Sequence, residues 1–82
     1  MSKFTMVLNG VLKSGGGWFA LATKQVQEDG LLRSDIDDVV AQFMNIINTA
    51  YREGTDGYIT FGDAAINIQS FAALSFVVHE YQ

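Results

Sequence analysis

The sequence predicts an α+β fold in which one antiparallel sheet of about five strands packs against one amphipathic helix, in the order β-β-α-β-β-β. One central segment, SDIDDVVAQFMNIINTAYREG, repeats its apolar residues with helical spacing, whereas the segments on both sides alternate as strands do. Short connections rich in glycine and aspartate separate the strand-like segments, which is typical of hairpins. With 82 residues and no tract resembling a linker, residues 1–82 are expected to form a single domain.

The first hairpin is predicted from a strand between Lys3 and Leu12 and a second strand from Trp18 to about Val26. The connection KSGGG raises the question of a phosphate-binding loop. A Walker loop has its lysine after the glycines and a helix behind it, whereas here Lys13 precedes the glycines and a strand follows. The glycines are therefore interpreted as a hairpin connection, in which positive φ angles are accessible.

The helix is predicted from Asp35 to Glu53, with Ser34 as its N-cap and Gly54 just past its end. Asp37 stands three residues after Ser34, where it would complete an imperfect capping box. The apolar residues that share one broad face of this helix are Ile36, Val39, Val40, Phe43, Met44, Ile46, Ile47, Ala50 and Tyr51.

The last third of the chain returns to strand patterns. The segments YITF and AAINI flank Gly62-Asp63, which is expected to be a two-residue hairpin turn. A tight reversal is predicted near Gln69-Ser70, followed by the long run FAALSFVVHEY. Because that run is apolar on both faces, we expect it to be a central strand or one covered on both sides.

Self-association is predicted from the amount of apolar surface. One helix covers only one face of a sheet, and 49% of the residues are hydrophobic, which is more than so small a monomer can bury. We therefore expect at least a homodimer. The apolar residues expected on the uncovered face, and hence the candidates for the oligomer interface, are Val7, Val11, Phe19, Leu21, Ala73 and Val77, with Ala65 belonging to the same apolar set.

Charge and composition exclude several classes of protein. The net charge of −4 and five scattered Lys and Arg residues argue against direct binding to nucleic acid. No apolar run is long enough to span a bilayer, and MSKFTMVLNG lacks the apolar core of a signal peptide. A cytoplasmic protein without membrane contact is therefore expected. Without cysteine and with one histidine, a structural zinc site is not expected either.

No residue pattern predicts catalysis, a cofactor or a metal site. Asp35, Asp37 and Asp38 diverge around the first helical turn, where the helix dipole explains their charge. His79 has no cysteine to act with, and Ser75 lies about 13 Å away along an extended strand. A Ser-His pair assembled by the tertiary structure or across subunits stays open. The sequence is otherwise interpreted as that of a protein that is not an enzyme.

Two kinds of partner besides a second copy are compatible with these residues. One is a host protein, bound through an acidic and aromatic surface; the other is a small anionic, nucleotide-like ligand held at subunit junctions. Protein binding is favoured because an interaction surface needs no special residue types. The candidates for ligand binding, chosen by chemical type alone, are Lys13, Trp18, Lys24, Arg33 and Arg52.

The sequence has the pattern of a hairpin that begins near a lysine, one amphipathic helix and a closing segment YITFGDAAINIQSFAALSFVV. This pattern, which covers most of the chain, resembles small phage or mobile-element proteins. The resemblance implies an accessory or host-takeover protein that binds and sequesters something. It contains no diagnostic motif, so no residue role is inferred from it.

Overall fold

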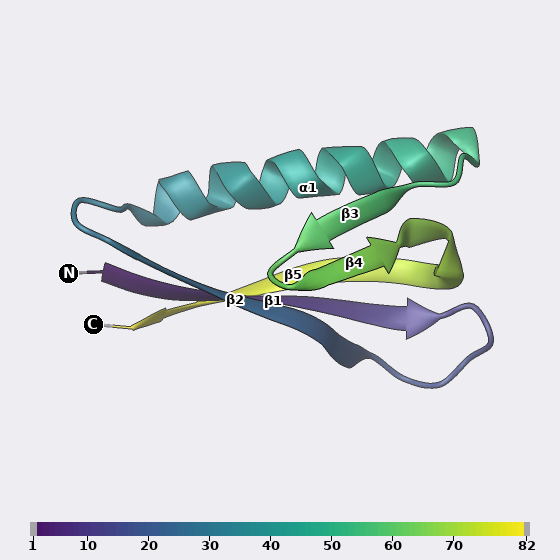
Figure 1. Cartoon of the computed structure of the whole chain (residues 1–82), viewed down its shortest axis with the longest axis horizontal. Helices are drawn as coiled ribbons and strands as arrows, with labels where there is room; N and C mark the ends of the chain where they lie inside the picture. The colour runs from purple at the N-terminus through teal and green to yellow at the C-terminus, as the bar shows by residue number, and fades with distance from the viewer. Residues whose placement is uncertain (1, 82) are drawn as a thin grey trace.

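The computed structural model describes residues 2–81 and contains a long helix lying over strands (Figure 1). The predicted order of one helix and five strands is confirmed. The elements are β1 (Ser2–Leu12), β2 (Phe19–Glu28), α1 (Arg33–Glu53), β3 (Tyr58–Phe61), β4 (Ala64–Asn67), the 3₁₀ turn η1 (Ile68–Ser70) and β5 (Phe71–Tyr81).

The expectation of one five-stranded sheet is wrong. The long strands form a three-stranded antiparallel sheet in the order β2-β1-β5, and β3 pairs only with β4 in a separate two-stranded sheet. Three strands span about 14 Å, whereas one helix is only about 10 Å wide. The β3-β4 hairpin lies beside α1 over the same face of the large sheet (Figure 1). Its side chains Ile59, Phe61 and Ile66 are buried. It therefore completes the covering layer and does not extend the sheet.

Strand β1 forms the centre of the fold, because it pairs with both β2 and β5. Its side chains Phe4, Met6 and Leu8 point into the core and are at most 1% exposed. The expectation that the last strand is central or covered on both sides is wrong, since β5 is an edge strand. Its apolar residues do occupy both faces, but only one face meets the helix, and Val77 on the other is 41% exposed.

Three aromatic rings join the covering layer to the large sheet. Phe43 of α1 meets Phe61 of β3 edge-on at 5.6 Å and Phe76 of β5 at 5.5 Å between ring centroids. The rings of Phe61 and Phe76 are 5.2 Å apart, again in an edge-to-face arrangement. Rings at this spacing attract one another beyond the effect of burial. The three rings therefore fix the helix, the hairpin and β5 relative to one another.

The helix begins two residues earlier than predicted, at Arg33, and Leu32 replaces Ser34 as its N-cap. The carboxylate of Asp35 accepts the backbone N–H of Leu32 at 2.9 Å. An acidic side chain in the first helical turn can accept a hydrogen bond from a backbone N–H that has no partner inside the helix. This does not require a polar side chain at the N-cap. The predicted end is confirmed, because Gly54 adopts the left-handed conformation with φ 64°.

The predicted turns are also confirmed. Gly15 and Gly16 have φ angles of 105° and 96°, and the N–H of Gly15 donates to the carbonyl of Leu12 at 3.0 Å, so KSGGG does connect two antiparallel strands. Phe61 pairs with Ala64 across the Gly62-Asp63 turn. The reversal predicted near Gln69 is the 3₁₀ turn η1. In the described part of the chain, no helix has both the length and the apolar character that crossing a membrane requires.

Candidate functional site

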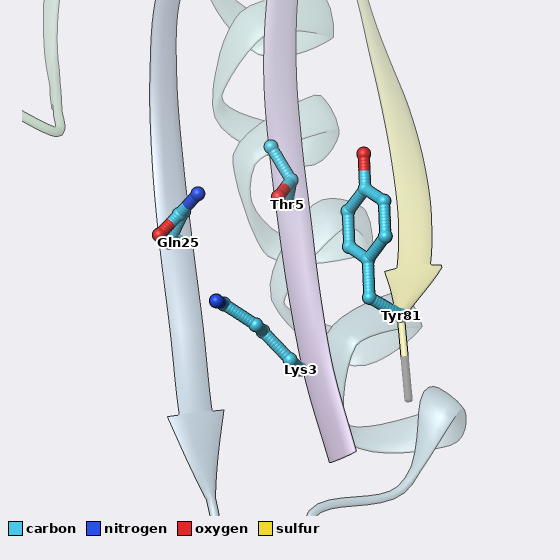
Figure 2. A pocket seen from close by; sticks show the side chains of 4 residues that line it. All are labelled: Lys3, Thr5, Gln25 and Tyr81. Atoms are coloured by element: carbon cyan, nitrogen blue, oxygen red, sulfur yellow. The ribbon is translucent and has the colours of Figure 1, made fainter.

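The face of the β2-β1-β5 sheet that is turned away from α1 is not covered by any described element. We call it the open face; Figure 2 looks onto part of it, with the helix behind the sheet. Side chains alternate between the two faces of a strand, so the pairing register defines its members. They are Lys3, Thr5, Val7, Asn9 and Val11 on β1, Ala20, Thr23, Gln25 and Gln27 on β2, and Ala73, Ser75, Val77, His79 and Tyr81 on β5.

The open face carries no carboxylate among these side chains, although the protein has nine acidic residues. Glu28 and Glu80 alternate to the helix side of their strands, and the other acidic residues lie on α1 and in loops. Among the described side chains of the open face, Lys3 is the only Lys or Arg. Within residues 2–81 it has no ion-pair partner, because the single ion pair found there joins Arg33 and Asp37. The open face therefore has a more positive potential than the acidic remainder of the molecule.

A shallow hollow of about 380 Å³ lies on the open face, lined by Lys3, Thr5, Gln25 and Tyr81. These residues come from all three strands, as Figure 2 shows. Thr5 is only 9% exposed and lies on the central strand, whereas Tyr81 on β5 is 50% exposed. The side chain of Lys3 extends toward β2 in Figure 2. The hollow thus combines an ammonium group, a hydroxyl, an amide and an aromatic ring.

The outer edges of β2 and β5 are both unpaired within the described residues, but they differ in their protection. Natural edge strands discourage pairing with other chains by means of lysine, proline or a bulge. Strand β2 has Lys24 near its middle and a bulge at Leu21. Strand β5 has a bulge at Ala72 near its start, but from Ala73 to Tyr81 it runs regularly without Lys, Arg or Pro, and its one acidic residue, Glu80, lies near its end. The β5 edge is therefore the one open to strand pairing.

A second exposed surface lies where β1 and β2 meet the glycine connection. Leu12, Trp18 and Phe19 are 38%, 57% and 44% exposed there, and we call them the aromatic tip. The ring of Phe19 lies 6.4 Å from that of Phe71, which anchors this side of the tip to the core. A Cβ atom added at Gly17 would meet nothing within 4 Å, so the connection projects into open space.

The five predicted ligand-binding residues are not brought together. Lys13 and Trp18 lie in the β1-β2 connection, and the Nζ atom of Lys13 donates to Gln69 Oε1 at 3.3 Å. Arg33 pairs with Asp37 at the first turn of α1, roughly 28 Å along the helix axis from Arg52 near its end. Lys24 lies opposite Met6 and therefore on the helix side of β2.

Four of the predicted interface residues, Val7, Val11, Ala73 and Val77, do share the open face. The expectation that Phe19 and Leu21 lie on the uncovered face is wrong, because both lie on the helix side of β2. The cause is the bulge in β2: Leu8 pairs with Ala22 but Asn9 pairs with Ala20, so Leu21 is an extra residue that reverses the alternation beyond it. Leu21 packs against the core as a result. Ala65 lies in β4 of the smaller sheet.

Within residues 2–81, no group of three or more His, Asp or Glu side chains is close enough to hold a metal ion. His79 is exposed on the open face, with Val77 between it and Ser75. Tyr51 donates its hydroxyl to the carbonyl of Phe71 at 3.0 Å, and burial raises the pKa of this phenol. That contact holds α1 to the start of β5.

Sequence reasoning missed the hollow, because its four residues meet only once the register of three strands is known. The available signal was the polar spacing of Lys3 and Thr5 on β1 and of Gln25 and Gln27 on β2. Comparison with known proteins finds no family model that matches the chain, no similar curated protein and no similar solved structure.

Proposed function

We propose that this protein is a non-catalytic binding protein that acts as a homodimer, formed by antiparallel pairing of two β5 edges. The observation that supports the proposal is the unpaired edge of β5, which is regular and without Lys, Arg or Pro from Ala73 to Tyr81. A strand edge presents alternating backbone donors and acceptors, so it is complementary to a second copy of itself. Such pairing about a two-fold axis closes after two subunits.

The side chains of β5 favour one register, with the two copies of Val77 facing each other. In that register His79 faces the partner's Ser75, Tyr81 faces the partner's Ala73, and Glu80 faces the partner's Leu74. No two like charges are opposed, and the exposed valines cover each other on the open face. The two three-stranded sheets then form one continuous sheet, with the β2 edges and their Lys24 residues on the outside.

The bound partner in this proposal is a protein, and the aromatic tip is its contact surface. Trp18 and Phe19 are the kind of large side chains that dominate binding energy at protein interfaces. The neighbouring glycines allow the connection to adjust to a partner. The alternative is an anionic, nucleotide-like ligand held at subunit junctions, with the candidates Lys13, Trp18, Lys24, Arg33 and Arg52. It lacks such support, because these side chains are dispersed within one chain. The phage or mobile-element origin stays a prediction.

Light scattering coupled to size-exclusion chromatography at micromolar concentration tests the dimer. A mass of twice 9.0 kDa is expected for the wild type. Val77→Lys opposes two ammonium groups and is expected to give a monomer, whereas Thr23→Lys on the open face of β2 leaves the dimer intact. Mixing Val77→Lys with Val77→Glu is expected to restore a heterodimer, which separates a lost interface from a misfolded chain. A wild-type monomer throughout the concentration range contradicts the proposal.

Chemical cross-linking in the source cell, followed by mass spectrometry, tests the tip. One polypeptide is expected to cross-link to the wild type and to be lost with Trp18→Ala. The control is Tyr58→Ala, which removes an aromatic side chain of similar exposure (69%) from β3. If Trp18→Ala and Tyr58→Ala cross-link to the same polypeptides as the wild type, the tip is not the contact surface.

A further inference from the structure

We infer that the hollow lined by Lys3, Thr5, Gln25 and Tyr81 binds a small aromatic anion, that is, a planar ring bearing one phosphate or carboxylate group. The hollow is complete in a single chain, because its three strands all belong to one sheet. This site goes beyond the proposed protein-binding function, and it does not depend on dimer formation.

The distribution of charge selects an anion. Lys3 is the one ammonium group on a face without carboxylates, and it has no ion-pair partner within residues 2–81. Its cross-strand neighbours, Gln27 and Tyr81, have no carboxylate side chain. An ammonium group without a nearby carboxylate attracts an anion more strongly than one already paired. A small anion therefore meets less repulsion here than elsewhere on a protein of net charge −4.

The uncharged groups of the hollow add hydrogen bonds from two directions. Gln25 lies opposite Thr5 across the β1-β2 pair, so an amide and a hydroxyl flank the space that Lys3 reaches in Figure 2. Both residue types donate hydrogen bonds, and the oxygen atoms of a phosphate or carboxylate accept several. Lys3, Thr5 and Gln25 therefore offer hydrogen-bond donors to one phosphate or carboxylate group.

Tyr81 supplies the reason for a ring in the ligand. Its side chain stands on the β5 side of the hollow, with half of its surface exposed (Figure 2). A flat π-face beside hydrogen-bond donors favours a planar partner that stacks on it. The volume of about 380 Å³ lies at the small end of ligand sites, so a single ring with one anionic substituent fills it. Because the hollow is shallow, a dissociation constant on the order of 1 mM is expected for such a fragment.

A titration of ¹⁵N-labelled protein with phenyl phosphate, followed by NMR, tests this site. Saturable shifts are expected for the backbone amides of Lys3, Thr5, Gln25 and Tyr81 and their neighbours. Inorganic phosphate lacks the ring and benzyl alcohol lacks the charge, so each is expected to bind at least fivefold more weakly. The absence of saturable shifts at these residues overturns the proposal, as does equal affinity for phenyl phosphate and inorganic phosphate.

Matched variants separate this site from general charge effects. Lys3→Gln is expected to weaken phenyl phosphate binding about tenfold, whereas Lys24→Gln removes the same charge from the helix side of β2 and leaves it unchanged. Tyr81→Ala is expected to weaken binding, and Tyr58→Ala serves as its control. Equal losses in both lysine variants overturn the proposal. The Val77→Lys variant, tested as a monomer, adds an ammonium group to the open face and is expected to bind phenyl phosphate at least as tightly as the wild type. A loss of the dimer without a loss of phenyl phosphate binding therefore separates the two proposals.

Discussion

The side-chain nitrogen Nε2 of Gln69 lies 2.9 Å from the carbonyl oxygen of Ala50, within the last turn of α1. The same amide donates to the carbonyl of Thr55 at 2.9 Å, and its oxygen accepts from Lys13. The last four carbonyls of a helix have no partner inside the helix. Gln69 therefore satisfies a helix terminus from the 3₁₀ turn and also ties it to the connection between β1 and β2.

Replacing this amide is expected to destabilise the fold. Gln69→Ala removes two hydrogen bonds to backbone carbonyls, so the free energy of unfolding is expected to fall by about 1–2 kcal/mol. Urea denaturation at a fixed protein concentration measures the change. Gln42→Ala, which removes the same side chain from the exposed side of α1, is expected to stay within about 0.5 kcal/mol of the wild type. Equal losses in the two variants would contradict the role assigned to Gln69.

Gly10 on the central strand is expected to tolerate no side chain. A Cβ atom there would lie 2.9 Å from both Leu21 Cδ1 and Phe71 Cδ1, and 3.1 Å from Leu74 Cδ2. Gly10→Ala therefore overpacks the core and is expected to cost about 1–3 kcal/mol in a denaturation experiment. The control is Gly17→Ala, where the added carbon meets nothing within 4 Å. If Gly10→Ala is as stable as Gly17→Ala, the core accommodates the added carbon atom and the prediction is wrong.

Two aromatic residues of the short strand β3 are expected to differ sharply in their effect on stability. Phe61 is 1% exposed and contacts Phe43 and Phe76, so Phe61→Ala is expected to cost about 3–5 kcal/mol. Tyr58→Ala, three residues earlier, is expected to change stability by no more than about 0.5 kcal/mol. If Phe61→Ala does not fold, Phe61→Leu is the variant to measure, with an expected loss of about 1–3 kcal/mol. A loss in Phe61→Leu no larger than that in Tyr58→Ala would refute the assignment.

Tyr51 is expected to make the fold sensitive to alkaline pH. Burial raises the pKa of its hydroxyl above the ordinary value of 10.0, and this hydroxyl donates to Phe71. The folded state thus holds the proton more tightly than the unfolded state, so stability is complete below about pH 10 and falls as the pH rises through the folded pKa. Melting temperatures measured from pH 8 to pH 11 are expected to fall more steeply for the wild type than for Tyr51→Phe. Parallel curves would contradict the assignment.

Only part of the hollow could be predicted from the sequence. Lys3 and Thr5 share a face by simple alternation, which is visible in the sequence. Gln25 joins them only because β2 pairs with β1 in one register, and Tyr81 only because the last strand pairs with the first. The bulge at Leu21 has no comparable sequence signal, yet it places Phe19 on the helix side of the sheet and Ala20 on the open face.

The sequence by itself determined the local elements of this protein. The helix and its end at Glu53 follow from the helical repeat of apolar residues and from Gly54, which adopts the left-handed conformation; both are local features of the sequence, whereas the start at Arg33 was predicted two residues late. Only the tertiary structure decided that β3 and β4 leave the main sheet and that β5 is its edge. Which strands pair depends on how segments that are distant in the sequence pack together into one core. A strand that is apolar on both faces is compatible with several such arrangements.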